Sequence, residues 1–129
     1  MKLDLFSINI QRGRDNGVAT YNEARKAFGL SPVSSFASIL EPNSSDFAQK
    51  LTSLYTSPDN LDLWLGILIE NHVNGGIVGE LGVEIIGQTF RNLRDGDRFW
   101  FEEMYPQKVI EEIKRTTLSD IRRRNTNAK

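Results

Sequence analysis

Apolar residues recur along this chain at intervals of three or four positions, and polar or glycine-containing stretches separate the segments in which they do so. Such spacing places apolar side chains on one face of an α-helix. The longest pattern predicts the strongest helix of the chain, and its apolar positions are Ile77, Val78, Leu81, Ile85, Ile86, Phe90 and Leu93. Because no repeated alternation of strands is found, the pattern predicts a mainly α fold.

A shorter helical pattern lies near the N-terminus. Tyr21, Ala24, Ala27 and Phe28 follow helical spacing. Gly29 suits the C-terminal end of this helix, because glycine adopts a positive φ without strain.

The middle of the chain predicts two helices in succession. Asn43 and Asp46 resemble a helix N-terminus, since a short polar side chain can accept hydrogen bonds from free backbone N–H groups. The apolar stripe of the first helix is Phe47, Leu51, Leu54 and Tyr55. Residues 58–60 end that helix and start the second, whose buried face is expected to be Leu61, Trp64, Leu65, Leu68 and Ile69. Gly75 and Gly76 then break the chain.

The C-terminal third contains further helix signals. Residues 94–97 predict a turn held by local hydrogen bonds. Pro106 suits a first helical position, and the apolar residues that follow it are Val109, Ile110 and Ile113. Thr117 with Asp120 predicts the cap of a last helix. We interpret three aromatic side chains as core residues rather than electron-transfer groups: Trp64, Phe99 and Trp100.

Residues 3–14 are consistent with either a helix or a strand. Gly13 and Gly17 bracket three polar residues and predict a stop or a turn there. We interpret Arg14 and Asp15 as structural residues that pair with neighbours and shape this turn.

Composition narrows the range of functions. The chain has 129 residues, enough for one domain, and a net charge of −1, which gives no general attraction to nucleic acid. It contains no cysteine, so disulfides and thiolate metal sites are excluded. No apolar run reaches the ~20 residues of a membrane span, and the N-terminal residues do not resemble a signal peptide. The sequence assigns no cellular compartment.

Histidine chemistry is confined to His72, the single histidine of the chain. Its position beside Gly75 and Gly76 favours a loop residue with local hydrogen bonds over a haem or metal ligand. The sequence also lacks the GxSxG, P-loop, HExxH and GxGxxG motifs. From composition and spacing alone, the chain is a helical domain without an assigned activity.

Two motifs change this picture. The first reads LFSINIQRGRDNG at residues 5–17 and is followed by YNEAR at residues 21–25. The second block begins with NLDLWLG at residues 60–66 and ends with RDGDRFW at residues 94–100. Both resemble stretches of the animal-type haem peroxidases of the peroxidase–cyclooxygenase superfamily, in the same order and at compatible spacing. The resemblance covers residues 5–125 and implies the C-terminal helical portion of that fold.

The resemblance implies that residues 1–129 are an incomplete haem peroxidase domain. In the family, the distal histidine, the catalytic distal arginine and the proximal histidine all precede the NxQRGRD motif. We therefore expect no catalytic residue and no metal ligand in this chain, and no activity from the chain alone. Asn16 stands where the family pattern often has a histidine that is not an iron ligand.

The resemblance also assigns two residues to the cofactor. Asn9 matches the asparagine whose side-chain oxygen accepts a hydrogen bond from the proximal histidine. Such an acceptor fixes the orientation of a metal-bound imidazole. Arg12 matches the arginine that meets a haem propionate, and a planar guanidinium suits a carboxylate. On a helix, residues three apart share a face, so one helix could supply both contacts.

The function implied is that of a haem-dependent peroxidase that oxidises a small-molecule donor with hydrogen peroxide. Its cofactor is haem, either b-type or covalently modified, and the remainder of the peroxidase domain is its partner. Two alternatives stay open: a fatty-acid oxygenase of the same superfamily, suggested by residues 21–29, and a non-catalytic interaction remnant that has lost haem.

Overall fold

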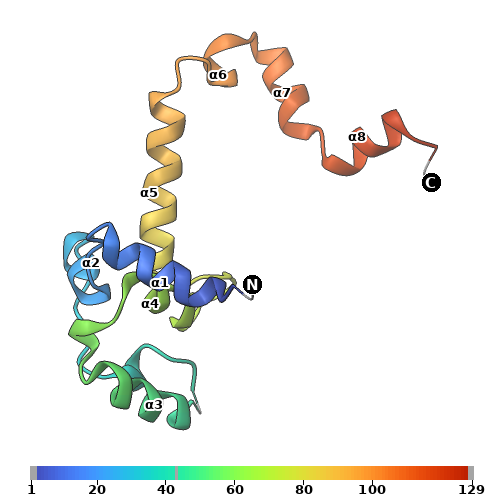
Figure 1. Cartoon of the computed structure of the whole chain (residues 1–129). Helices are drawn as coiled ribbons and strands as arrows, with labels where there is room; N and C mark the ends of the chain where they lie inside the picture. Colours follow the sequence, from blue (N-terminus) through green and yellow to red (C-terminus); the bar gives the residue numbers. More distant parts are fainter. Residues whose placement is uncertain (1–2, 43, 128–129) are drawn as a thin grey trace. The chain divides into compact units, whose positions relative to one another are not determined.

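The structure, a computed structural model, describes residues 3–42 and 44–127 (Figure 1). Its α-helices are α1 (Leu5–Asp15), α2 (Tyr21–Ala27), α3 (Ser45–Tyr55), α4 (Leu63–Ile69), α5 (Glu80–Gly96), α6 (Phe101–Met104), α7 (Gln107–Arg115) and α8 (Leu118–Asn125). Two 3-10 helices are η1 (Phe36–Ser38) and η2 (Pro58–Asn60). These described residues form no strand, only isolated bridges. The predicted mainly α fold class is confirmed.

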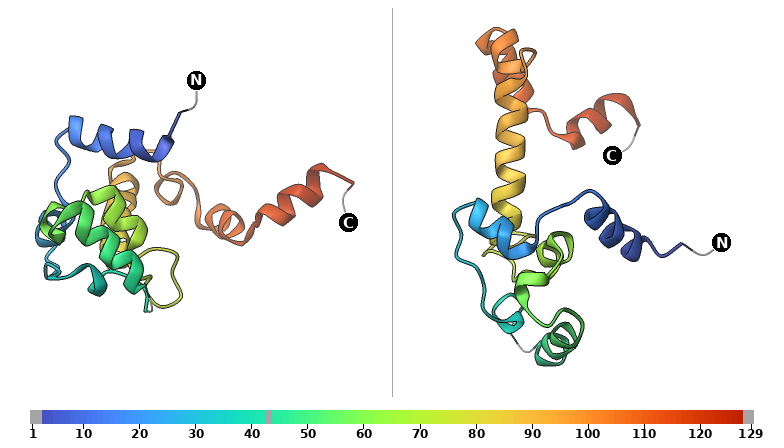
Figure 2. Two further views of the ribbon diagram at one scale, coloured as in Figure 1. Left: turned by 60° about the horizontal axis from the view of Figure 1, so that its bottom comes forward. Right: turned by 60° about the vertical axis from the view of Figure 1, so that its left-hand side comes forward.

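The chain divides into two compact units, residues 1–88 and 89–129. In the first unit, helices α1 and α2 both contact α4, and α3 contacts η1; Figure 2 gives two further views of these elements. The buried apolar side chains of this unit form one cluster: Tyr21, Ala24, Phe36, Ile39, Leu40, Leu51, Leu61, Leu65 and Leu81. The core therefore joins segments that are distant in the sequence.

Gly66 allows α2 and α4 to approach closely. A Cβ atom at this position would lie 2.2 Å from Cδ2 and 2.7 Å from Cγ of the Tyr21 ring. Both distances are shorter than any ordinary carbon–carbon contact, so the fully buried Tyr21 ring occupies the space that a side chain would need. The glycine in the NLDLWLG motif is thus a packing requirement.

The second unit contains α6, α7 and α8. Ile110 is the one buried residue among its described positions. Lys114 of α7 pairs with Glu102 of α6 at 2.6 Å. Thr117 and Asp120 form a capping box at the start of α8, which confirms the predicted cap.

Several predicted elements are present with shifted ends. The ambiguous segment 3–14 is helical from Leu5 onward. The turn predicted at residues 94–97 lies a few residues further on, since α5 continues to Gly96. The turn is held by local hydrogen bonds: the backbone N–H of Trp100 donates to the backbone oxygen of Asp97 at 2.9 Å, and that of Phe99 donates to the Asp97 side chain at 2.9 Å. Pro106 is the N-cap of α7 rather than its first residue. Asn43 lies outside the described residues, and Ser44 is the N-cap of α3.

The buried faces were predicted only in part. Leu51, Leu61 and Leu65 are buried as expected. Leu54 and Leu68 are exposed, because no described element packs against those faces of α3 and α4. The core assignment fails for Phe99, which is exposed, and holds only in part for the half-buried Trp64 and Trp100.

Candidate functional site

Helix α1 begins at a side-chain cap. The carboxylate of Asp4 accepts hydrogen bonds from the backbone N–H groups of Phe6 and Ser7 at 3.0 and 3.2 Å. The Ser7 hydroxyl donates to the same carboxylate at 2.6 Å, and these bonds hold the pKa of Asp4 below its usual value. At the other end, Gly17 adopts a φ of +64°, which suits glycine. The N-terminal cap by Asp4 favours a helix over a strand for the first motif.

Asn9 and Arg12 lie one turn apart on α1. An Nη2 group of Arg12 donates a hydrogen bond to Oδ1 of Asn9. Both side chains line the same pocket, whose volume is about 420 Å³. The structure thus brings the two predicted site residues together at one pocket.

The pocket lies between α1, the residues that follow it, and the start of α4. It is lined by Asn9, Ile10, Arg12, Gly13, Asn16, Val18, Asp62, Leu63, Trp64 and Ile67. Trp64 packs edge-on against Phe6, with ring centroids 4.8 Å apart. The wall is largely apolar and carries a few polar groups, contributed by α1 and by Asp62 at the start of α4, which is typical of cofactor sites.

Arg14, Asp62 and Tyr55 form a polar cluster at the edge of this pocket. Nε and Nη2 of Arg14 donate to the two carboxylate oxygens of Asp62 at 2.9 and 2.7 Å. The Tyr55 hydroxyl donates to Oδ2 of Asp62 at 2.7 Å. The Arg14 guanidinium lowers the pKa of Asp62, while burial and the Asp62 carboxylate raise the pKa of Tyr55 to about 12.

The sequence predicts only part of this cluster. The ion pair confirms that Arg14 is a structural residue, but its partner is Asp62 and not a neighbour within the turn. Asp62 is not predicted as a site residue, and Tyr55 is predicted only as part of an apolar stripe. Arg14 and Asp62 are 48 positions apart, so no local pattern could connect them.

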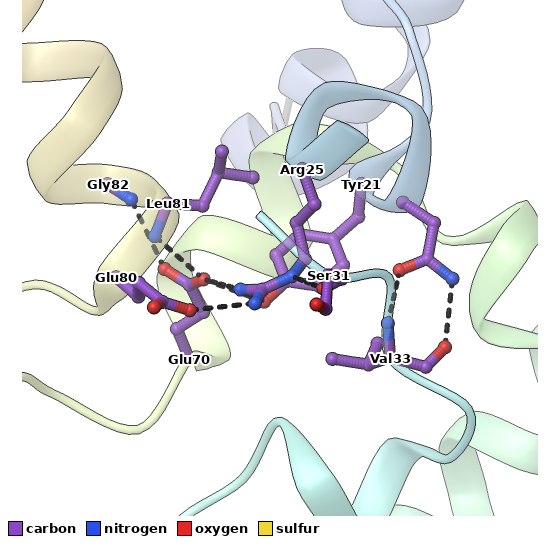
Figure 3. Close-up of polar contacts among 9 residues, drawn as sticks. Tyr21, Arg25, Ser31, Val33, Glu70, Glu80, Leu81 and Gly82 are labelled. Atoms are coloured by element: carbon purple, nitrogen blue, oxygen red, sulfur yellow. Dashed lines mark hydrogen bonds and ion pairs between the residues drawn. The ribbon is translucent and has the colours of Figure 1, made fainter. Parts of the chain in front are cut away.

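A second polar cluster lies inside the core (Figure 3). The Glu70 side chain is only 4% exposed, and its Oε1 accepts hydrogen bonds from the Tyr21 hydroxyl at 2.6 Å and from Nη1 of Arg25 at 3.4 Å. The backbone N–H groups of Leu81 and Gly82 donate to the same carboxylate at 3.1 and 3.3 Å. Glu70 thereby caps α5 and ties it to α2, a role that the sequence did not predict.

Arg25 extends this cluster to the surface. Its Nη2 donates to Glu80 at 2.7 Å, and its Nε donates to the backbone oxygen of Ser31 at 2.6 Å. Burial and the neighbouring Glu70 carboxylate raise the pKa of the Tyr21 phenol, which therefore stays protonated. Among the described residues, no buried side-chain nitrogen or oxygen lacks a partner. The buried side chains of this cluster are therefore all engaged in hydrogen bonds that join α2 to the start of α5.

His72 lies in the loop between α4 and α5, as predicted. Its backbone N–H donates to Glu41 at 3.3 Å, and its backbone pairs with Gly79 in an isolated bridge. Within residues 3–42 and 44–127, no group of three or more histidine, cysteine, aspartate or glutamate side chains could hold a metal ion. No helix in the described part of the chain is long and apolar enough to cross a membrane.

Comparison with known proteins gives one family and one fold. The family described as animal haem peroxidase matches residues 1–129. Thyroid peroxidase of Sus scrofa is 42% identical over 122 residues, which cover 92% of this chain and 13% of that protein. The chain spans 18% or less of the length of the curated relatives that it matches most strongly.

Solved structures agree with this family. Peroxidase A from Dictyostelium discoideum superposes with a TM-score of 0.83 at 37% identity, over 96% of this chain and 24% of that one. The fatty acid alpha-dioxygenase of Oryza sativa superposes with a TM-score of 0.80 at 26% identity, over 95% of this chain and 21% of that one. The helical arrangement is therefore shared by both kinds of enzyme.

Proposed function

The chain belongs to the animal haem peroxidase family, and from this membership we propose that it is the C-terminal part of a haem peroxidase that oxidises a small-molecule donor with hydrogen peroxide. The observation that carries the proposal is the pairing of Asn9 and Arg12 at one largely apolar pocket. The preceding part of the domain would supply the histidines.

The residues of the pocket fit a haem. An apolar wall that includes Trp64 and Ile67 suits the macrocycle, and the Arg12 guanidinium suits a propionate, because its planar donors match a carboxylate. The Asn9 side-chain oxygen suits the free N–H of a metal-bound imidazole. When bound, haem would supply the peroxide-driven oxidation of the donor. The role of this chain is to orient the histidine ligand through Asn9 and to retain the haem through Arg12.

In the structure, Arg12 donates a hydrogen bond to Asn9. With haem and the proximal histidine in place, the Asn9 oxygen would accept from the histidine and Arg12 would turn to the propionate. One internal hydrogen bond is thus exchanged for two external ones.

A fatty-acid oxygenase is the second candidate. The observation in its favour is the superposition on a fatty acid alpha-dioxygenase. Sequence identity favours a peroxidase, since the curated relatives near 40% identity carry peroxidase names. The full-length protein separates the two: a peroxidase turns over small aromatic donors with hydrogen peroxide, whereas an oxygenase consumes dioxygen with a fatty acid.

The decisive experiment replaces Asn9 and Arg12 in the full-length protein that contains this chain. Asn9→Ala removes the acceptor, so the imidazole becomes less basic and the reduction potential of the iron rises. Asn9→Asp lowers the potential, because an ionised carboxylate accepts more strongly. Loss of such a bond typically reduces metal affinity or activity about 10–100-fold. Spectroelectrochemistry measures the potentials after haem content has been determined.

Arg12→Ala separates the two roles. It weakens haem retention through the propionate and changes the potential less than Asn9→Ala does. Arg91→Ala, an exposed arginine of α5, serves as the control for loss of one positive charge. If both Asn9 variants keep the parent potential and turnover, Asn9 does not contact the proximal ligand and the proposal for this residue is wrong.

A further inference from the structure

We infer that Asp62 is a positioning residue: it holds the pocket helix α1 in place through Arg14, and Tyr55 in turn holds Asp62. The inference concerns the pocket described above, and it rests on the proposed function only for the identity of the ligand. Three features support it: α1 is joined to α4 near both of its ends, the Asp62 carboxylate points toward α1, and Asp62 and Arg12 line the same pocket.

Within the part of the chain that the structure describes, none of the residues of α1 is buried. Side-chain contacts join both ends of α1 to α4 and its N-cap residue. Phe6 packs on Trp64 near the start of the helix, and Arg14 binds Asp62 near its end. Asn9 lies between these two attachments. A helix held at its ends changes the position of its middle when either attachment is lost.

Asp62 is turned toward α1 instead of capping its own helix. It occupies the N-cap position of α4, where an aspartate side chain usually accepts a backbone N–H of the first turn. Here the side chain makes no such bond, and both oxygens accept from Arg14. The Asp62 side chain is 14% exposed, whereas the Arg14 side chain is 57% exposed. Asp62 is therefore the better-packed partner of the pair, and the more exposed Arg14 side chain binds to it.

Tyr55 fixes the carboxylate from the other side. Its hydroxyl donates to Oδ2 of Asp62 at 2.7 Å. The next residue, Thr56, has a φ of 64° and a ψ of −44°, and Ser57 N–H donates to the Tyr55 carbonyl at 2.7 Å. This γ-turn is strained in a residue with a side chain, and such turns persist where surrounding contacts hold them. The Tyr55 ring itself packs against the buried core cluster, which holds its hydroxyl beside Asp62.

The cluster also controls the charge of the pocket. Asp62 lines the same pocket as Arg12, so an unpaired Asp62 carboxylate would attract the Arg12 guanidinium. Arg14 donates to both oxygens of Asp62, and Tyr55 donates to one of them. Arg12, which donates to Asn9, is therefore not drawn to Asp62 and can turn to an anionic group of a ligand, such as a carboxylate.

The test uses amide hydrogen exchange in the full-length protein, with Asp62→Asn, Tyr55→Phe and Arg14→Ala as variants. Asp62→Asn should speed exchange of the amides of residues 9–15 about 3- to 10-fold, while α2 amides keep the parent rate. Arg14→Ala should give a similar increase, and the double variant should add nothing to Asp62→Asn, because both changes remove one contact. Tyr55→Phe should give a smaller increase.

Asp15→Asn is the matched control. It removes a carboxylate from the same helix, where Asp15 accepts only from Gln11 among the hydrogen bonds of the described chain, and the contact with α4 is kept. The inference is overturned if Asp62→Asn leaves α1 exchange unchanged, if α1 and α2 amides speed up equally, or if Arg14→Ala and Asp62→Asn are additive.

The rate of haem loss to an acceptor protein is measured on the same variants. Faster α1 exchange with faster haem loss supports both the anchoring role and the proposed function. Faster α1 exchange with an unchanged rate of haem loss supports the anchoring role and removes the haem contact from the proposed function. The two ideas can therefore fail separately.

Discussion

At the scale of single residues, Glu70 shows how a buried carboxylate is made compatible with a core. A buried charge is tolerated when hydrogen bonds and opposite charge compensate for the loss of water. Tyr21, Arg25 and two backbone N–H groups at the start of α5 provide this compensation. Removing one of these donors should weaken the contact between α2 and α5.

We predict that Tyr21→Phe destabilises the first unit by about 1.5–3 kcal/mol, the usual contribution of a hydrogen bond to a charged group. The ring stays in the core, so the loss reflects the hydroxyl alone. Hydrogen exchange of α2 and α5 amides in the full-length protein measures the change. Tyr105→Phe, at an exposed tyrosine, is the control and should change stability by less than about 0.5 kcal/mol.

The same hydroxyl gives this contribution a pH dependence. The folded pKa of Tyr21 is raised above its ordinary value of 10.0, so the stabilisation is complete below about pH 10 and is lost as the pH rises through the folded pKa. Tyr21→Phe should remove part of the alkaline loss of helical circular dichroism. An alkaline transition identical to that of the parent would contradict the assigned hydrogen bond.

At the scale of elements, the close approach of α2 and α4 depends on Gly66. We predict that Gly66→Ala destabilises the protein by about 1–3 kcal/mol, because the new methyl group would overlap the Tyr21 ring. Gly96→Ala is the matched control, since a Cβ there meets nothing within 4 Å. Thermal unfolding followed by circular dichroism compares the two. Equal stability of both variants would show that α2 can shift away from α4.

The elements show what the sequence could predict. The sequence predicts helix α5 because its apolar residues recur every three or four positions over a long segment, a spacing that a strand does not have. The segment before Gly13 was ambiguous, because Leu5, Ile8 and Ile10 fit both periods; the Asp4 cap decides it. The end of α5 was placed too early, since Asp95 and Gly96 favour turns but are also tolerated in a last helical turn.

In the candidate site too, the relations between residues close in the sequence were predictable and those between distant residues were not. The motif placed Asn9 and Arg12 on one face because they are three residues apart, a local relation. Asp62 and Glu70 act on residues 48 and 49 positions away. Such contacts depend on how helices pack, which no spacing along the chain encodes.

At the scale of the whole molecule, many large apolar side chains lie on the surface. Leu54 and Ile77 of the first unit and Leu118 of the second are 77%, 88% and 82% exposed. Apolar surface of this extent usually marks an interface. The chain also spans only 13% of thyroid peroxidase, so the preceding part of the same domain is the natural occupant under the proposed function.

We predict that the isolated chain is helical by circular dichroism but unfolds with low cooperativity, and that it binds an apolar dye or associates with itself. The full-length protein is the control and should bind much less dye. A sharp two-state melt of a monomer would contradict this prediction and indicate an independent domain.

The bond between Asn9 and Arg12 has a consequence for binding. Under the proposed function, any new partner of either side chain competes with this bond. The contacts made by Asn9 and by Arg12 should therefore form together, so that binding at one of the two positions is coupled to binding at the other.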